Sequence, residues 1–237
     1  MSGTSLGYFS NLSAVFYGFP GIVAWIPNLA RRLGIRLSRF KSNLGMGRGL
    51  LEPSEGGSWW SEHIPGWPQT NPDGESYLKN PERFQFSLQS MAKWCGNTLI
   101  VKNLYLVDHL LQITRLLPDA YFVVLRRNLE ENAESLRVAD LGTLPVSSQL
   151  FSALPPGVQM VDGEDHGTFS KRRVVATHQY IEEVLGSSKV PESRICRLDF
   201  EEVRSNPSVA LSRVMTMLGA EGRSLRVYPR NIPRSFD

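Results

Sequence analysis

The chain has 237 residues, of which 41% are hydrophobic and 21% charged, a composition that is typical of a folded globular protein and excludes disorder. Its net charge of +3 is too small to indicate nucleic-acid binding, but it is compatible with an anionic ligand. Only two cysteines occur, Cys95 and Cys196, which excludes a disulfide scaffold and a CxxC site and favours a reducing, cytoplasmic environment. The length suits a single domain over residues 1–237.

The stretch Leu6–Ala30 carries no charge and is long enough to span a bilayer. Its prolines and glycines would leave backbone groups unsatisfied in lipid, so we expect a buried helix followed by an irregular apolar wall. A secretory signal is disfavoured because the basic residues follow the apolar run instead of preceding it.

A basic run comes next and contains no acidic residue. Its members are Arg31, Arg32, Arg36, Arg39, Lys41 and Arg48. They form either a solvated helix face or a surface that attracts an acidic acceptor or an anionic membrane. The sequence therefore leaves peripheral membrane contact open.

The segment from residue 45 to residue 81 has the composition of a loop, with many glycines, prolines and serines. Three of the five tryptophans lie here: Trp59, Trp60 and Trp67. Aromatic side chains on loops either line a pocket or pack as a lid, and the sequence does not decide between the two.

From Pro81 onwards the hydrophobic pattern is regular. It predicts a helix over Phe84–Trp94, a strand over Thr98–Val101, a helix over Leu106–Leu117, a strand over Tyr121–Leu125, a helix over Leu129–Val138, an irregular stretch over Asp140–Gly167, a helix over Ser170–Leu185, a strand over Arg194–Leu198 and a helix over Pro207–Leu218. This alternation predicts an α/β layer fold with a parallel sheet. Residues 140–169 are expected to form a lid or an acceptor loop.

Cationic side chains stand where two of the predicted strands end. Ligands of parallel sheets bind outside the carboxyl ends of the strands, which places Lys102, Arg126 and Arg127 at the ligand edge. A lysine there is either solvated or acts as a point charge on a leaving-group oxygen.

The sequence allows two interpretations of the role of Arg127. Ser135 lies eight residues later in the next predicted helix, so the arginine and the hydroxyl could converge on one phosphate. Alternatively, Arg127 is a surface side chain paired with Glu130 or Glu131.

The start of the chain has small residues with hydroxyl groups, namely Ser2, Gly3, Thr4 and Ser5. Before a helix such a segment forms an anion nest. Gly3–Gly7 also matches the G-x-S-x-G elbow of α/β hydrolases with Ser5 as the nucleophile, but that elbow follows a strand, and we expect no strand before Gly3. No metal-ligand spacing occurs.

Taken together, these segments resemble the sulfotransferases that use 3′-phosphoadenosine 5′-phosphosulfate, and more the bacterial and Golgi-type branch than the cytosolic aryl type. Ser2–Ser5 is similar to the end of the family's RSGTT/S loop, and Glu52–Trp60 to its EPHEFGYFW stretch. Leu99–Leu136 resembles the K-x-P and R-D-P…S segments, and Arg194–Gly219 the YEDL…NP…FLG block. The matches follow the family's order over nearly the whole chain.

The resemblance implies a single sulfotransferase-like domain with a P-loop-like three-layer fold, in which helices flank a central parallel sheet and the first strand is missing. The sequence also departs from the family's pattern at individual residues. Met1 stands where the family has a cation, Asn103 and Leu104 follow Lys102 in place of the K-x-P proline, and Asp199 or Phe200 replaces the tyrosine of YEDL.

The resemblance also implies roles for individual residues. Ser2, Gly3, Thr4 and Ser5 would hold the 5′-phosphosulfate, Arg127 and Ser135 the 3′-phosphate, and Lys102 would neutralise the bridging oxygen. A carboxylate in apolar surroundings is the expected general base, with Glu55 and Glu52 as candidates and His63 as the next choice.

The acceptor would be a small molecule, a lipid or a carbohydrate with a hydroxyl or amine group, and neither a metal nor a nucleic acid is expected. Two alternatives stay open. One is a truncated, inactive remnant that still binds the nucleotide, and the other is a serine hydrolase that uses Ser5.

Overall fold

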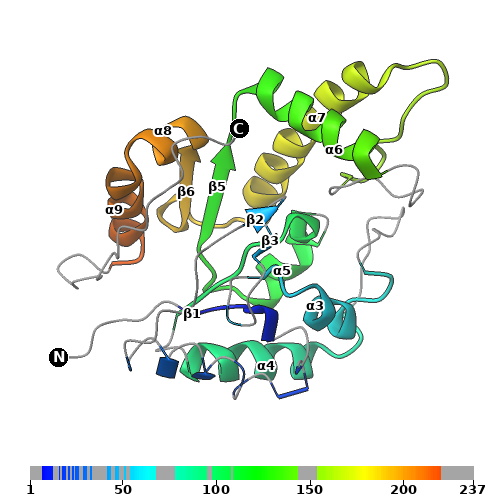
Figure 1. Cartoon of the computed structure of the whole chain (residues 1–237). Coiled ribbons are helices and arrows are strands. Elements are labelled where there is room, and N and C mark those ends of the chain that lie inside the picture. The colour runs from blue at the N-terminus through cyan, green and yellow to red at the C-terminus, as the bar shows by residue number, and fades with distance from the viewer. Residues whose placement is uncertain are drawn as a thin grey trace.

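The computed structural model describes residues 7–12, 42–43, 46–47, 51, 54–67, 78–94, 98–107, 109–143 and 154–219, together with residues 16, 18, 19, 21, 23, 25, 26, 29, 30 and 33. This part of the chain has a mixed α/β fold that is mostly helical (Figure 1). Several of the residues singled out above lie outside the described residues: Met1, Ser2, Gly3, Thr4, Ser5, Glu52, Cys95 and the basic run of Arg31, Arg32, Arg36, Arg39, Lys41 and Arg48.

The described helices are α3 (Gly57–His63), α4 (Pro81–Trp94), α5 (Leu110–Leu116), α6 (Leu129–Thr143), α7 (His166–Ser187), α8 (Phe200–Ser205) and α9 (Pro207–Met217), with 3₁₀ turns η1 (Leu104–Val107) and η2 (Glu192–Arg194). The described strands are β1 (Gly7–Tyr8), β2 (Ser42–Asn43), β3 (Met46–Gly47), β4 (Leu99–Ile100), β5 (Phe122–Arg126) and β6 (Ile195–Asp199).

The elements predicted beyond Pro81 are confirmed to within a few residues at most of their ends, and three boundaries differ. The helix predicted over Leu106–Leu117 is divided into η1 and α5. The irregular stretch is shorter than predicted, because α6 continues to Thr143 and α7 begins at His166. Asp165 caps α7 by accepting hydrogen bonds from the backbone N–H groups of Gly167 and Thr168, which satisfies donors that a helix start leaves free.

The strands pair in parallel as predicted, but the described ones do not form one central sheet. Gly7–Tyr8 pairs with Leu99–Ile100, and Phe122–Arg126 pairs with Ile195–Asp199, which gives two separate two-stranded parallel sheets. A short antiparallel pair, β2 and β3, is also present. The expectation of a continuous central sheet is therefore not met within the described residues, where β1 and β4 each span only two residues.

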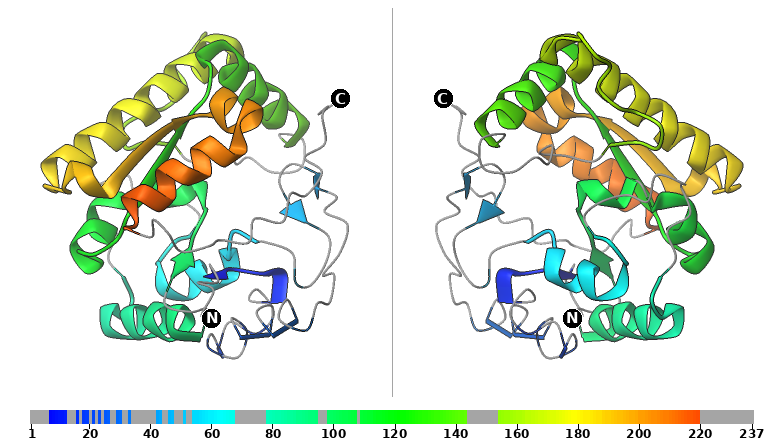
Figure 2. Two further views of the ribbon diagram at one scale, coloured as in Figure 1. Left: turned by 90° about the vertical axis from the view of Figure 1, so that its left-hand side faces the viewer. Right: turned by 90° about the vertical axis from the view of Figure 1, so that its right-hand side faces the viewer.

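The β5–β6 sheet lies between helices on both of its faces, as the two views of Figure 2 show. Successive side chains of a strand point to opposite faces. Ile195 accordingly packs into a cluster with residues of α5 and α7, whereas Cys196 and Leu198 pack against Ala210 of α9.

Charged side chains fasten α7 to the sheet and to α6. Glu182 of α7 forms ion pairs with Arg197 at 2.7 Å and with Arg126 at 2.6 Å, and hydrogen bonds from these arginines lower its pKa to about 2. Arg173 of α7 pairs with Asp140 of α6 at 2.9 Å, and both side chains are almost completely buried. Removing one member of such a buried pair leaves an uncompensated charge, so this contact fixes the α6–α7 packing.

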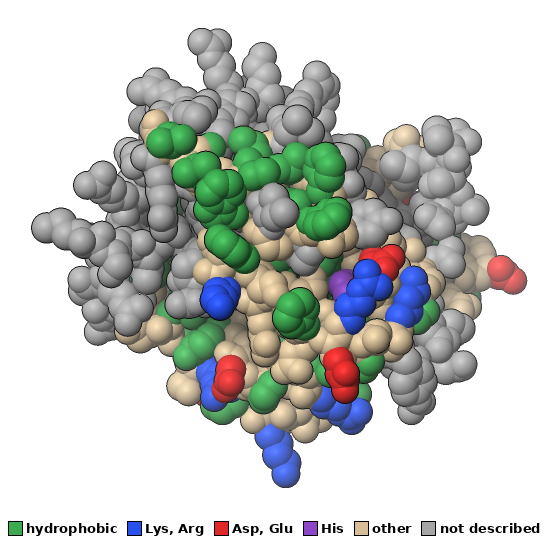
Figure 3. Space-filling view, turned by 90° about the horizontal axis from the view of Figure 1, so that it is seen from below, with side chains coloured by type: hydrophobic (Ala, Val, Ile, Leu, Met, Phe, Trp, Pro, Cys, Tyr) green, Lys and Arg blue, Asp and Glu red, His purple; other side chains and the backbone are tan. Residues whose placement is uncertain are grey.

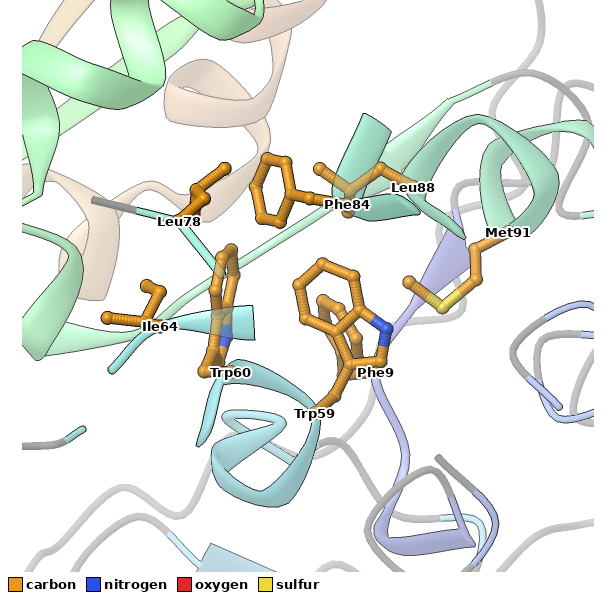
Figure 4. Close-up of a cluster of buried hydrophobic side chains, with 8 residues drawn as sticks. All are labelled: Phe9, Trp59, Trp60, Ile64, Leu78, Phe84, Leu88 and Met91. Carbon is orange, nitrogen blue, oxygen red and sulfur yellow. The ribbon is translucent and has the colours of Figure 1, made fainter. Parts of the chain in front are cut away.

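A second core is aromatic and joins α3, α4 and the residue after β1 (Figure 4). Trp59 and Trp60 are 1% and 2% exposed, and their rings meet edge to face with centroids 4.7 Å apart. Trp59 also donates a hydrogen bond to Ser87 of α4 at 2.9 Å. The loop predicted here is wrong for residues 57–63, which form α3, and the two tryptophans pack in the core instead of lining a pocket.

The start of the chain also differs from the prediction. The stretch expected to be a helix contains strand β1, and helical backbone is first found at residues 11–12. Phe16 and Phe19 are 52% and 65% exposed, so this stretch is not buried throughout. Among the described residues, the helices are all too short or too polar to cross a membrane.

Candidate functional site at the end of strand β4

The structure brings two of the predicted catalytic residues into direct contact. Lys102, which follows β4, forms an ion pair with Glu55, although the two residues are 47 positions apart in the sequence. The Lys102 side chain is 64% exposed and the Glu55 side chain 34% exposed. Ion pairs this open to solvent contribute only about 0–1 kcal/mol. An incoming anion can therefore replace Glu55 as the partner of Lys102 at little cost.

The backbone around Glu55 is fixed more firmly than its side chain. The Glu55 carbonyl oxygen accepts hydrogen bonds from the Asn103 side-chain amide at 2.9 Å and from the Trp60 indole N–H at 3.0 Å. Asn103 in turn accepts a bond from the Tyr105 backbone N–H at 2.9 Å, which is the local turn that asparagine favours. Glu55 is thus positioned by α3 on one side and by the end of β4 on the other.

The residues on either side of Glu55 attach the loop to the end of β1. The Ser54 backbone N–H donates to the Phe9 carbonyl at 2.8 Å. Gly56 adopts a left-handed conformation with φ of +68°, and a Cβ atom there would lie 2.9 Å from the Phe9 ring. Only glycine fits this position, because it lacks the Cβ and tolerates a positive φ.

Arg127 lies at the end of β5 and contacts two side chains. It forms an ion pair with Glu131 at 3.3 Å, one of the two partners that the surface interpretation named, and its guanidinium lies 5.2 Å from the Phe200 ring centroid. Ser135 is exposed and lies one turn beyond Glu131 on the same face of α6. No hydrogen bond or ion pair among the described residues joins Arg127 to Ser135 or to the Glu55–Lys102 pair.

His63, the third candidate base, is placed in the aromatic core. Its ring centroid lies 4.4 Å from that of Trp59 and 5.5 Å from that of Phe84. Burial is the main cause that lowers its pKa to about 4, so the ring is neutral at pH 7.

His109 lies in the same kind of environment. It is 2% exposed and stacks on Trp67 with ring centroids 5.8 Å apart. Neither of its ring nitrogens has a hydrogen-bond partner, and burial lowers its pKa to about 4. Protonating this ring would place an unpaired charge among aromatic side chains.

The charged side chains of the described residues define no metal site. Nowhere in the part of the chain that the structure describes do three or more His, Cys, Asp or Glu side chains gather closely enough to hold an ion. What the end of β4 offers is an exposed ammonium group beside a carboxylate on a fixed backbone. This arrangement suits an anionic ligand and a proton acceptor next to it.

Two residues of this site were not singled out by the sequence. Asn103 stood out only as a departure from the K-x-P pattern, and Gly56 was one of several glycines in a loop-like segment.

Comparison of the chain with protein-family models, with curated proteins and with solved structures finds no match.

Replacing Gly56 with alanine is predicted to damage the loop that carries Glu55. The Cβ atom would meet the Phe9 ring at 2.9 Å with φ held at +68°, so we expect a loss of at least about 2 kcal/mol in the free energy of unfolding. Gly57→Ala is the matched control, because nothing lies within 4 Å of a Cβ there. Urea unfolding measures both variants, and equal stability of the two would contradict the proposed constraint.

Replacing His109 with phenylalanine is predicted to reduce the acid sensitivity of the fold. The histidine has a pKa of about 4 in the folded protein and 6.5 otherwise, so the unfolded chain binds more protons and wild-type stability falls between pH 6.5 and pH 4. The variant lacks this loss. The free energy of unfolding of the variant minus that of the wild type should therefore rise by up to about 3 kcal/mol as the pH is lowered. Urea unfolding at several pH values measures the difference, and a difference independent of pH would refute the assignment.

Proposed function

We propose that the chain binds 3′-phosphoadenosine 5′-phosphosulfate and transfers its sulfuryl group to a hydroxyl or amine of an acceptor. The observation that carries the proposal is the Glu55–Lys102 pair at the carboxyl end of a parallel strand. The ordered resemblance of the sequence to sulfotransferases supports it. In this proposal the layers around β5–β6 and the aromatic core belong to one P-loop-like fold.

Lys102 supplies positive charge to the leaving group. The acceptor oxygen or nitrogen attacks sulfur, the bond from sulfur to the bridging oxygen breaks, and adenosine 3′,5′-bisphosphate leaves with the bonding electrons. Negative charge builds up on that bridging oxygen, where an ammonium group stabilises it. Lys102 is exposed and only weakly bound to Glu55, so it is free to turn toward the nucleotide.

Glu55 takes the proton of the acceptor. The Glu55 backbone carbonyl accepts hydrogen bonds from Trp60 and Asn103, and this positions the side-chain carboxylate beside Lys102. Once Lys102 turns to the nucleotide, the Glu55 carboxylate loses its partner and can accept a proton. We assign this role to Glu55 rather than to His63, because the His63 ring is buried between Trp59 and Phe84.

Arg127 and Ser135 bind the 3′-phosphate. The cation–π contact with Phe200 holds the Arg127 guanidinium at the end of β5, where the sheet presents its ligand edge. The ion pair with Glu131 directs the side chain along the face of α6 that also carries Ser135. A phosphate that bound there would replace the exposed Glu131 carboxylate.

Arg127→Ala is predicted to weaken the binding of adenosine 3′,5′-bisphosphate by about ten- to a hundredfold, because a hydrogen bond to a charged group contributes about 1.5–3 kcal/mol. Arg213→Ala is the control, since Arg213 is also exposed and paired with a glutamate but lies on α9. Isothermal titration calorimetry measures both affinities. Equal affinity of the wild type and Arg127→Ala would remove Arg127 from the site, and no binding by the wild type would refute the proposed function.

A further inference from the structure

Large apolar side chains are exposed together at the base of the molecule, near α4. They comprise Phe16, Phe19, Trp25, Leu33 and Trp94, with exposed fractions from 42% to 65%, and we call them the aromatic patch. Figure 3 shows hydrophobic side chains gathered on the face seen from below. An exposed group of this kind on a folded domain marks an interaction surface.

Short contacts connect the segment that carries Phe16 and Phe19 to Trp94. The Phe19 backbone N–H donates to the Phe16 carbonyl at 3.0 Å, which places these two side chains within one turn. A Cβ atom at Gly21 would lie 2.8 Å from Trp94 Nε1, so this segment touches the end of α4. Both views of Figure 2 show the same proximity between the start of the chain and α4.

The sequence around the aromatic patch is strongly basic. No Asp or Glu occurs before Glu52, whereas six cations lie between Arg31 and Arg48. These six exceed the net charge of +3 of the whole chain, so the remaining residues together are net acidic. Arg31 and Arg32 directly precede Leu33 of the patch in the sequence. The partner of this surface must therefore accept apolar side chains and carry negative charge.

We propose that the aromatic patch docks on the surface of a bilayer that contains anionic phospholipid. Tryptophan and phenylalanine insert at the boundary between headgroups and acyl chains, and the arginines that adjoin the patch in the sequence bind the anionic headgroups. In this arrangement the protein lies on the surface of the bilayer. A second copy of the chain fits less well, because it carries the same excess of cations before Glu52 and has no acidic residue there.

Vesicle flotation tests this proposal without any nucleotide, so its outcome is independent of the proposed function. The full chain is mixed with vesicles of phosphatidylcholine alone or of phosphatidylcholine with phosphatidylserine, at low and high salt. The wild type should bind the anionic vesicles at least about tenfold better than the neutral ones, and high salt should weaken that binding.

Three variants locate the binding surface. Phe19→Ser combined with Trp25→Ser should reduce binding to anionic vesicles by at least about tenfold, because two large apolar side chains no longer enter the bilayer. Val161→Ser, at a valine 63% exposed in the loop before α7, is the control and should bind like the wild type. Arg31→Gln combined with Arg32→Gln leaves every apolar side chain in place and should weaken binding to anionic vesicles alone.

Several results would overturn the proposal. The first is a wild type that does not float with anionic vesicles, and the second is a double serine variant that binds as well as the wild type. The third is a Val161→Ser control whose vesicle binding falls as much as that of the double serine variant. If sedimentation shows self-association of the wild type that the double serine variant lacks, the patch is instead a contact between copies. Circular dichroism checks that each variant is folded, and if the serine variant is not, the arginine variant decides.

Discussion

The loop Ser54–Gly56 connects parts of the molecule that are distant in the sequence, and the account of the site depends on it. The Ser54 backbone N–H donates a hydrogen bond to the backbone after β1. The Glu55 backbone carbonyl accepts hydrogen bonds from α3 and from the end of β4. Gly56 allows the close approach of Phe9, whose ring belongs to the aromatic core. The position of one exposed carboxylate is thereby set by buried packing, while its side chain stays free to change partners.

The sequence predicts the second half of the fold well because burial there follows simple periods. In β6, side chains alternate between the α7 face and the α9 face, and the last turns of α7 supply apolar side chains to the first of these faces. Helix α3 cannot be predicted from a hydrophobic period in this way. Glycine and serine at its start suggest a loop, and the helix is stabilised by burying Trp59 and Trp60, which is a property of the tertiary structure and not of local propensity.

The candidate site divides in the same way. The position of Lys102 follows from the rule that ligands meet the carboxyl ends of parallel strands, and the rule needs only the strand pattern. Its pairing with Glu55 cannot be predicted from the sequence. The two residues are 47 positions apart, and the chain offers Lys102 many other acidic side chains as partners. Asn103 acts through a side-chain bond to a distant carbonyl, and His63 is withdrawn into the core. Neither of these facts has a local signal in the sequence.

A crystal structure with adenosine 3′,5′-bisphosphate would examine the central claim most directly. The quantity to measure is the separation between Lys102 Nζ and the nearest oxygen of the 5′-phosphate. Our account expects a direct contact, with the Glu55 carboxylate turned away from the lysine and open to an acceptor. A bound nucleotide that leaves the Glu55–Lys102 pair intact and lies elsewhere on the molecule would contradict it.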